Sequence, residues 1–240
     1  MKVDILAFAA HPDDIEISCA GTIIKSVNEG KTVAIVDLTQ GELGTRGTVE
    51  TRYEEAAEAS RIMGISERVN LKLKDGFFVQ NEESLLKVIE QIRYFQPEII
   101  LANSITDRHP DHGKASKLIS DACFLSGLRK IETTYNGENQ LPHRPKAVYH
   151  YIQDRYIKPD FVIDVTPFMD ERMQAISAYK TQLYNPDVNS DEPKTPISGK
   201  DFYDFLIARM REFGRAIGTE YAEGFTVERY LGVKSLFDLE

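Results

Sequence analysis

The sequence predicts an α/β fold: a doubly wound, mostly parallel, Rossmann-like sheet with helices on both faces, formed by residues 1–240 as a single domain. Over the first half of the chain, compact apolar segments alternate four times with segments of helical spacing, which is the pattern of strand–helix units. Three of these segments show little alternation, as expected of parallel strands buried on both faces, whereas residues 69–73 alternate like a short strand. A chain of 240 residues also fits one large domain whose core needs no disulfide or structural metal.

The first half contains four predicted strands, each followed by a predicted helix. Residues 3–10 form a continuous apolar run, and residues 32–39 (TVAIVDLT) have the same character. The predicted strands are 3–10, 32–39, 69–73 and 99–103, and the predicted helices are 15–28, 51–63, 83–95 and 111–125. Gly30, Gly64 and Pro97 mark helix ends, because glycine is favoured just beyond a helix and proline cannot continue one.

The second half is less regular. Strands are expected at 148–152 and 161–165, and helices at 168–183 and 202–217. The polar stretch 185–200, which holds three prolines, separates the two helices and is predicted to be a loop. A loop at the mouth of a site and a plain surface connection are both consistent with this composition.

The composition excludes several classes of partner. With 38 acidic and 29 basic residues the net charge is -9, so nucleic acid and anionic membrane surfaces are not expected partners. Cys19 and Cys123 lie far apart in apolar helical patterns and are interpreted as reduced core thiols. The first apolar run is too short for a signal peptide and no apolar run reaches eighteen residues, so a cytoplasmic protein is expected.

Two polar motifs follow the first and fourth predicted strands. The first is His11 to Asp14 (HPDD), and the second is Asp107 to His112 (DRHPDH). In open α/β sheets, ligands bind beyond the carboxyl ends of the strands where the strand order reverses. In the common order 3-2-1-4, the first and fourth strands are neighbours at that reversal. Two motifs almost one hundred residues apart are therefore predicted to form one site.

The residue types in these motifs indicate a metal. A catalytic zinc ion takes three protein ligands and leaves one position for water, and His11, Asp14 and His112 fit that pattern. Asp13, His109 and Asp111 remain for proton handling. Spacing alone does not decide which of the two adjacent aspartates binds the metal, and iron or manganese accepts similar ligands. Taken singly, each motif also fits a plain structural role, with the aspartates as helix N-caps and the His-Pro pairs in turns.

The two motifs resemble those of the LmbE-like, or PIG-L, zinc-dependent deacetylase family. That family has an AHPDD-type motif after its first strand and an HPDH-type motif later, present here at 10–14 and 109–112. Further similarity lies at 37–56, 71–76 and 221–225. Within the family the chain looks most similar to the bacillithiol-biosynthesis branch, which deacetylates N-acetylglucosaminyl malate.

The resemblance implies roles for nine residues. It makes His11, Asp14 and His112 the zinc ligands. Asp13 becomes the general base, His109 the second catalytic residue and Asp111 the partner that orients His109. Arg52, Asp75 and Arg144 stand where the family binds substrate or supports the catalytic histidine. The implied substrate is a small amino-sugar conjugate, and the implied assembly is a homo-oligomer, a trimer or a hexamer.

These roles predict a mechanism for acetamide hydrolysis. Asp13 would take a proton from the attacking water and return it to the departing amine. His109, held as an imidazolium by Asp111, would stabilise the tetrahedral oxyanion. The glycine-rich loop 41–47 would wall the pocket; its glycines suit either a close approach to a sugar or a simple turn.

Three other functions compete with this one. A related metal-dependent hydrolase would cleave the amide of a thiol conjugate or deacetylate another glycan. A nucleotide-binding dehydrogenase or kinase is disfavoured, because no G-x-G-x-x-G follows the first strand and no G-x-x-x-x-G-K-[ST] occurs. A non-catalytic metal-binding module of the same fold is the third.

Overall fold

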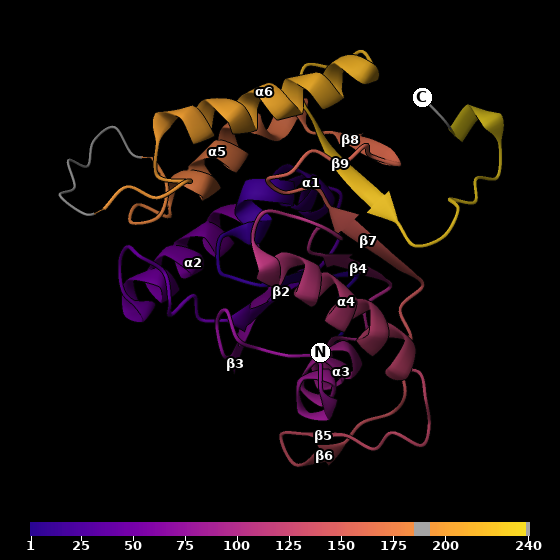
Figure 1. Cartoon of the computed structure of the whole chain (residues 1–240). Coiled ribbons are helices and arrows are strands. Elements are labelled where there is room, and N and C mark those ends of the chain that lie inside the picture. Colours follow the sequence, from indigo (N-terminus) through magenta and orange to yellow (C-terminus); the bar gives the residue numbers. More distant parts are fainter. Residues whose placement is uncertain (185–192, 239–240) are drawn as a thin grey trace.

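A seven-stranded sheet with the order β3-β2-β1-β4-β7-β9-β8 forms the centre of the computed structural model, which describes residues 1–184 and 193–238 (Figure 1). The strands are β1 Ile5–Ala9, β2 Val33–Thr39, β3 Glu67–Leu73, β4 Ile99–Ala102, β7 Ala147–Tyr151, β8 Phe161–Asp164 and β9 Ala222–Val227. A small hairpin of β5 Thr134–Tyr135 and β6 Glu138–Asn139 lies apart from the sheet. The predicted order 3-2-1-4 is confirmed.

The pairing of β1 determines which strand ends lie next to each other. It is parallel to β2 on one side and to β4 on the other, with Ala7 opposite both Ile35 and Leu101. Every residue of β1 and β2 is buried, as the lack of alternation in their sequences predicts. The carboxyl ends of β1 and β4 therefore lie side by side at one edge of the sheet.

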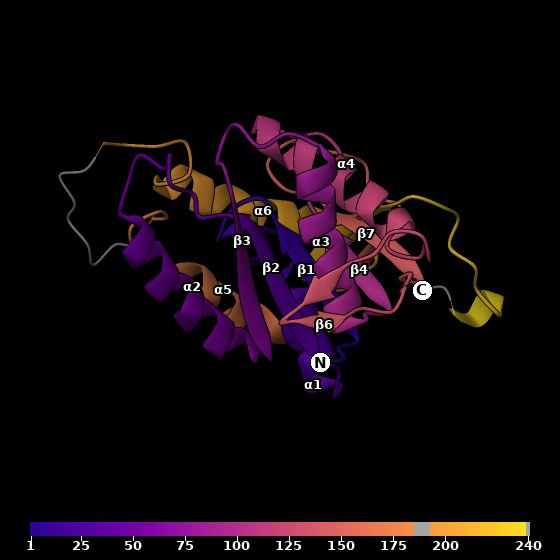
Figure 2. The ribbon, with the colours of Figure 1, turned by 90° about the horizontal axis from the view of Figure 1, so that it is seen from below.

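Helices cover both faces of the sheet. They are α1 Asp14–Asn28, α2 Val49–Met63, α3 Glu82–Phe95, α4 Pro110–Leu125, α5 Met169–Ser177 and α6 Lys200–Ala216. Helices α1, α2 and α5 pack together on one face, and α3 and α4 pack on the other (Figure 2). Alternate residues of β1 enter the two cores, Ala7 in one and Leu6 with Phe8 in the other.

The second half differs from the prediction in several elements, including the β5–β6 hairpin, which was not predicted. Strand β9 was not predicted; it pairs antiparallel with both β7 and β8, and so joins β8 to the sheet. Helix α5 ends at Ser177 rather than near Leu183, because the backbone beyond it is bonded elsewhere: the N–H of Thr181 donates to Glu55 at 2.7 Å. A short 3-10 turn, Thr166–Phe168, precedes this helix.

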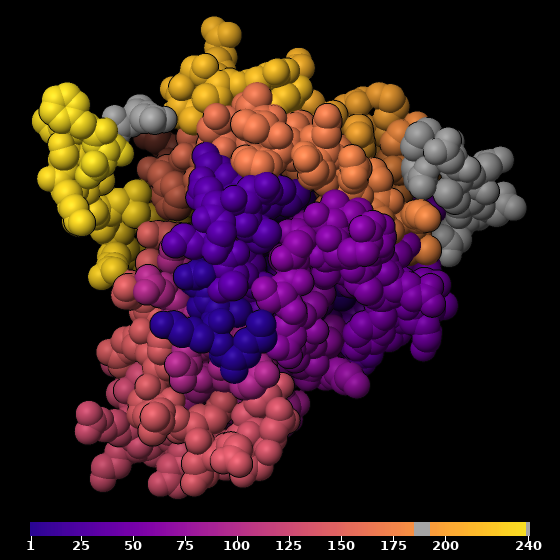
Figure 3. Space-filling model, turned by 180° about the vertical axis from the view of Figure 1, so that it is seen from behind, coloured from indigo at the N-terminus to yellow at the C-terminus, as the bar shows by residue number. Residues whose placement is uncertain are grey.

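The remaining segments bear on earlier expectations. Cys19 and Cys123 are free and buried. None of the helices that the structure describes is long and apolar enough to cross a bilayer. Of the predicted loop 185–200, residues 185–192 lie outside the described residues, and 193–199 lead into α6. The chain after β9 runs along one margin of the molecule to a 3-10 turn at Leu236–Asp238 (Figure 3).

Candidate active site

A cavity of about 290 Å3 opens at the carboxyl ends of β1 and β4. Both polar motifs line it, the first where β1 leads into α1 and the second where the loop after β4 leads into α4. Residues of the loop after β2 form another wall, and Thr195 to Ile197 line it from the segment before α6. The described part of the predicted loop 185–200 therefore contributes to the site rather than forming a remote surface connection.

His11, Asp14 and His112 meet at the floor of this cavity. The two oxygens of Asp14 face different histidines: Oδ1 lies 3.1 Å from Nε2 of His112, and Oδ2 lies 3.7 Å from Nδ1 of His11. The two imidazole rings are 5.5 Å apart between centroids. All three residues are buried. The chain thus brings together the three residues predicted to bind a metal.

Two further groupings involve the same histidine. Nitrogens of His11, His109 and His112 lie within 4.8 Å of one another, as do ligand atoms of His11, Asp75 and Asp111. His11 belongs to both because its two nitrogens point in different directions. Nδ1 faces Asp14, whereas Nε2 lies 3.0 Å from Asp75 and 3.5 Å from Asp111.

Neighbouring carboxylate and amide side chains make hydrogen bonds to His11, His112 and Asp14. Asp107 meets Nδ1 of His112 at 2.5 Å, and Asp75 meets Nε2 of His11 at 3.0 Å. The amides of Asn103 and Gln153 each donate to one oxygen of Asp14, at 2.9 and 3.0 Å. A histidine whose other nitrogen is fixed by a carboxylate is the usual arrangement at metal sites.

The electrostatics of the floor are those of tightly paired opposite charges. Burial lowers the pKa of His112, but Asp14 and Asp107 outweigh it and raise that pKa to about 9. Burial raises the pKa of Asp14, yet the adjacent histidines hold it well below its ordinary value. Burial also lowers the pKa of His11, but hydrogen bonds with Asp111, Asp14 and Asp75 raise it well above its ordinary value. Metal binding to the two histidines would therefore compete with protons.

Asp13 has a strained backbone and a buried carboxyl group. Its φ of 123° is rare for any residue but glycine, and its side chain makes no capping hydrogen bond to α1. Burial raises the pKa of Asp13 to about 7. The positive charge of Arg52, whose Nη1 lies 3.6 Å from Oδ2 of Asp13, lowers this pKa but does not cancel the effect of burial. Asp13 thus stands at the N-cap position of α1 without its side chain capping the helix.

Arg52 fills the space left by two glycines of the loop 41–47. A Cβ at Gly41 or Gly44 would lie 2.8 Å from its guanidinium. Nη1 donates to the carbonyl of Pro12 at 3.2 Å, and Nη2 donates to Gln182. The glycines therefore make room for an arginine that supports the HPDD turn, a role that neither interpretation of the loop included.

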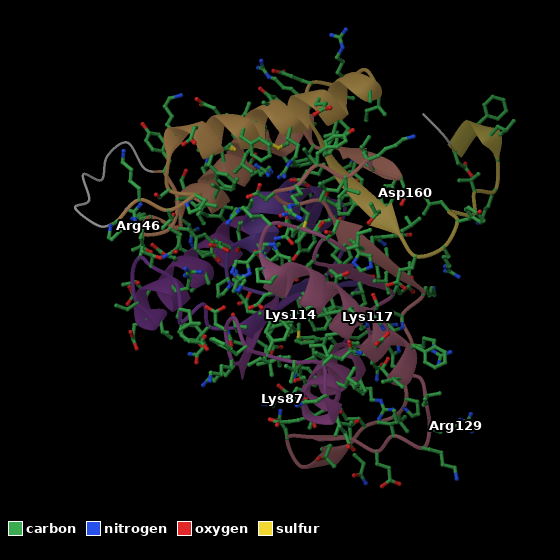
Figure 4. The ribbon with its side chains drawn as sticks, viewed as in Figure 1. Arg46, Lys87, Lys114, Lys117, Arg129 and Asp160 are labelled. Carbon is green, nitrogen blue, oxygen red and sulfur yellow. The ribbon has the colours of Figure 1, made fainter. Side chains whose placement is uncertain are left out.

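Asp111 does not hold His109 as predicted. Its carboxylate accepts from the N–H of Gly76 at 2.7 Å and from Lys114 of α4 (labelled in Figure 4) at 3.0 Å, and it faces His11. Its backbone N–H donates to Nδ1 of His109 at 3.3 Å. Burial and the charges of the neighbouring histidines lower the pKa of His109. The lowered pKa and the N–H donated to Nδ1 favour the neutral form of His109 over the predicted imidazolium.

Arg144 lies outside this site. Its guanidinium stacks on the ring of Phe124 at 4.4 Å and donates to the carbonyl of Phe124 at 2.8 Å. It lines a separate hollow of about 590 Å3 between α4, β7 and the chain after β9. The expectation that Arg144 contacts substrate beside Arg52 and Asp75 is not met within this chain. A lone arginine in the sequence carried no signal of its position.

Asp107, Asn103 and Gln153 also belong to the site, although no role was predicted for them. Two signals could have found them. Asp107 belongs to the second motif, and Asn103 and Gln153 are polar residues at or just after the carboxyl ends of β4 and β7. Polar residues at that edge of a parallel sheet belong to the site by position.

The chain is similar to several known proteins. Residues 6–123 match the PIG-L family, described as GlcNAc-PI de-N-acetylase. A crystal structure of a conserved protein from Thermus thermophilus superposes with a TM-score of 0.85 and 34% identity, covering 97% of this chain and 98% of that one. Diacetylchitobiose deacetylase of Thermococcus kodakarensis is 26% identical over 92% of this chain and 81% of its own length.

Two more distant relatives differ in their named reactions. A probable N-acetyl-alpha-D-glucosaminyl L-malate deacetylase of Bacillus subtilis is 26% identical over 76% of this chain and 84% of its own length. The 4-oxalmesaconate hydratase of Pseudomonas putida is 24% identical over 74% of this chain and 73% of its own length.

Proposed function

The chain belongs to the PIG-L family of N-acetyl-sugar deacetylases, and we propose that it hydrolyses the N-acetyl group of N-acetylglucosaminyl malate with zinc, giving the free amino sugar and acetate. This is a step of bacillithiol biosynthesis. One observation carries the proposal: His11, Asp14 and His112 converge in a cavity beside a buried, strained Asp13. The Bacillus relative supports the choice of the malate conjugate.

The residues at the floor fit a zinc ion. Two imidazole nitrogens and a carboxylate are the donor set of catalytic zinc sites. The outer nitrogens of both histidines are held by Asp75 and Asp107, so the inner nitrogens are directed at Asp14. We assign His11, Asp14 and His112 as the ligands, because Asp14 has one oxygen toward each histidine. When bound, zinc supplies a Lewis acid and lowers the pKa of a water to about 7.

Asp13 is the general base of the proposed reaction. It lies next to Asp14 in the chain and lines the cavity. A carboxyl group with a pKa of about 7 accepts a proton far more readily than an ordinary aspartate and can return it at neutral pH. Asp13 therefore takes a proton from the attacking water and delivers it to the nitrogen of the departing amine.

His109 stabilises the developing oxyanion as a neutral donor. The N–H of Asp111 donates to Nδ1, so the proton of the neutral ring is on Nε2. His109 lines the cavity, and its Nε2–H is the hydrogen-bond donor available to the carbonyl oxygen of the substrate. An oriented donor of this kind is worth about 3 to 4 kcal/mol at the transition state.

A second candidate function is the addition of water to a carbon–carbon double bond of an unsaturated tricarboxylic acid, which the hydratase relative favours. Both reactions use a water and a base beside a metal site, so the floor residues do not separate them. An amidase acting on a thiol conjugate and a deacetylase of another glycan are the alternatives within amide hydrolysis.

One experiment tests the proposal. Purified protein is assayed for acetate release from N-acetylglucosaminyl malate, diacetylchitobiose and N-acetylglucosamine. It is also assayed for hydration of an unsaturated tricarboxylic acid and for amide cleavage of a thiol conjugate. The malate conjugate should be the best substrate, a chelator should abolish its turnover, and added zinc should restore it. Faster hydration, or faster release from another amide, would reject the proposed substrate. Activity that a chelator leaves unchanged would reject the metal.

A further inference from the structure

Helix α1 is broken at Cys19, and two buried side chains replace the hydrogen bond lost at the break. Cys19 has φ -146° and ψ 20°, outside the helical region. In a regular helix the N–H of Gly21 would donate to the C=O of Ile17. Here the N–H of Gly21 donates to Glu223 at 3.0 Å, and the C=O of Ile17 accepts from Arg172 at 2.5 Å.

Arg172 and Glu223 form an ion pair shut off from water. Nε of Arg172 lies 2.7 Å from Oε1 of Glu223, and their side chains are 0% and 1% exposed. Oε2 of Glu223 also accepts from the backbone and the hydroxyl of Thr22, at 2.7 Å each. A carboxylate here caps the second part of α1, where the exposed N–H groups favour negative charge. Arg172 and Glu223 therefore bond to each other, and each also bonds to the backbone on one side of the break in α1, Arg172 to Ile17 and Glu223 to Gly21.

The short first part of α1, residues 14–18, carries the metal-binding turn. The N–H of Ile17 donates to the carbonyl of Asp13 at 3.0 Å, so the residue that Arg172 grips also fixes the backbone of Asp13. On its other side, Glu16 accepts from Arg68 at 2.7 Å and from Tyr179 at 3.1 Å. The direction of this segment is set by side chains from β3, α5 and the turn after α5, rather than by the rest of α1.

We propose that Arg172 and Glu223 are positioning residues that hold the turn carrying Asp13 and Asp14 toward the cavity, an inference that rests on the proposed function. The break allows residues 14–18 to run in a different direction from the rest of α1, and the ion pair fixes that direction. Loss of the link would allow the segment to resume a continuous helix. Asp14 would then turn away from His11 and His112, and Asp13 would leave its strained backbone conformation.

Arg172→Lys tests the link while keeping the charge. A lysine has a single ammonium group and cannot reproduce the fork that reaches Glu223 and Ile17 at once. Zinc affinity, measured by competition with a chromophoric chelator, should fall about 10-fold, and kcat should fall more than KM rises. Glu220→Gln is the control, because Glu220 pairs with Arg211 on the surface of the same region. Zinc affinity of Arg172→Lys within twofold of the parent would overturn the proposal.

A second set of variants separates positioning from stability. Glu223→Gln alone leaves a buried arginine unpaired and should lower the melting temperature strongly. The double variant Arg172→Met, Glu223→Gln removes both charges and should recover much of that melting temperature. Its zinc affinity should stay about 10-fold weaker than that of the parent, with faster hydrogen exchange at Gly21 and Thr22. If zinc affinity returned together with the melting temperature, the pair would be structural only and the proposal would fail.

The readouts also distinguish this inference from the proposed function. Zinc affinity and hydrogen exchange do not require a substrate. A parent protein that bound zinc but released no acetate from any substrate would reject the proposed function. A zinc affinity that was about 10-fold weaker in Arg172→Lys than in that parent would still support the positioning role.

Discussion

Oδ2 of Asp107 lies 2.5 Å from Nδ1 of His112, on the side of the ring away from Asp14. The other oxygen of Asp107 accepts from the N–H groups of Arg155 and Asp154, at 2.7 and 3.2 Å. The carboxylate is therefore fixed from behind while it receives the proton of Nδ1. This leaves Nε2 of His112 as the nitrogen able to bind a metal, and it sets the tautomer on which the site depends.

Asp107→Asn should weaken zinc binding by about 10- to 100-fold. An amide in this position can place its NH2 group against Nδ1, which favours the tautomer with the proton on Nε2 and blocks coordination. Competition with a chelator measures the affinity. Asp154→Asn, at the rim of the cavity, is the control and should leave zinc affinity unchanged. Equal affinities for the two variants would contradict the role of Asp107.

Asp13→Asn should keep zinc bound and lower kcat by about 100- to 10,000-fold. The amide preserves the size of the side chain and removes the group that accepts the proton, while His11, Asp14 and His112 remain. Metal content by elemental analysis and steady-state kinetics with the malate conjugate measure the two effects. A variant that retained most of its activity would show that another group is the base.

His109→Ala should lower kcat by about 100- to 1,000-fold with little change in KM, because its hydrogen bond strengthens as charge develops on the oxyanion. His109→Gln, which keeps a donor, should recover part of the rate. Kinetics of both variants at saturating substrate are the measurement. A normal kcat with only a raised KM would place His109 among the groups that bind the ground state.

Arg144→Ala should leave both kcat and KM within about twofold of the parent, because this arginine lies on a separate hollow with Phe124. The prediction opposes the role that family resemblance gave to Arg144. A KM raised tenfold, with an unchanged melting temperature, would show that Arg144 reaches a substrate after all, for instance one bound by a neighbouring subunit.

The first half of the fold was predictable because its signals are local. Strands β1, β2 and β4 are apolar runs and β3 alternates apolar and polar residues, so each can be read from its own residues, and a helix follows each strand along the chain. Strand β9 was missed because Glu223 and Gly224 interrupt it. Only Arg172 and the broken helix, far away in the sequence, make a buried glutamate acceptable there.

The positions of the two motifs were predictable from the sequence, because each motif follows the end of a predicted strand. The HPDD and HPDH motifs follow adjacent strands, so His11, Asp14 and His112 had to lie close together. The direction of a side chain within a motif is not determined in this way. Asp111 faces His11 rather than His109 because Gly76 and Lys114 hold its carboxylate. The contact with Gly76 depends on the packing of the loop after β3 against α4, which no local pattern in the sequence shows.

The dependence of kcat/KM on pH should report Asp13. Burial places its pKa at about 7, and the base must be ionised, so kcat/KM should rise with pH and level off above the pKa. A bound divalent cation favours the ionised form, which puts the acid limb at or below pH 7. The positive charge of Arg52 lowers this pKa, so Arg52→Gln should move the limb to higher pH. Arg61→Gln, an exposed arginine of the same helix paired with Glu58, is the control and should leave the limb unchanged. A limb that stayed in place in Arg52→Gln would show that the titrating group is not Asp13.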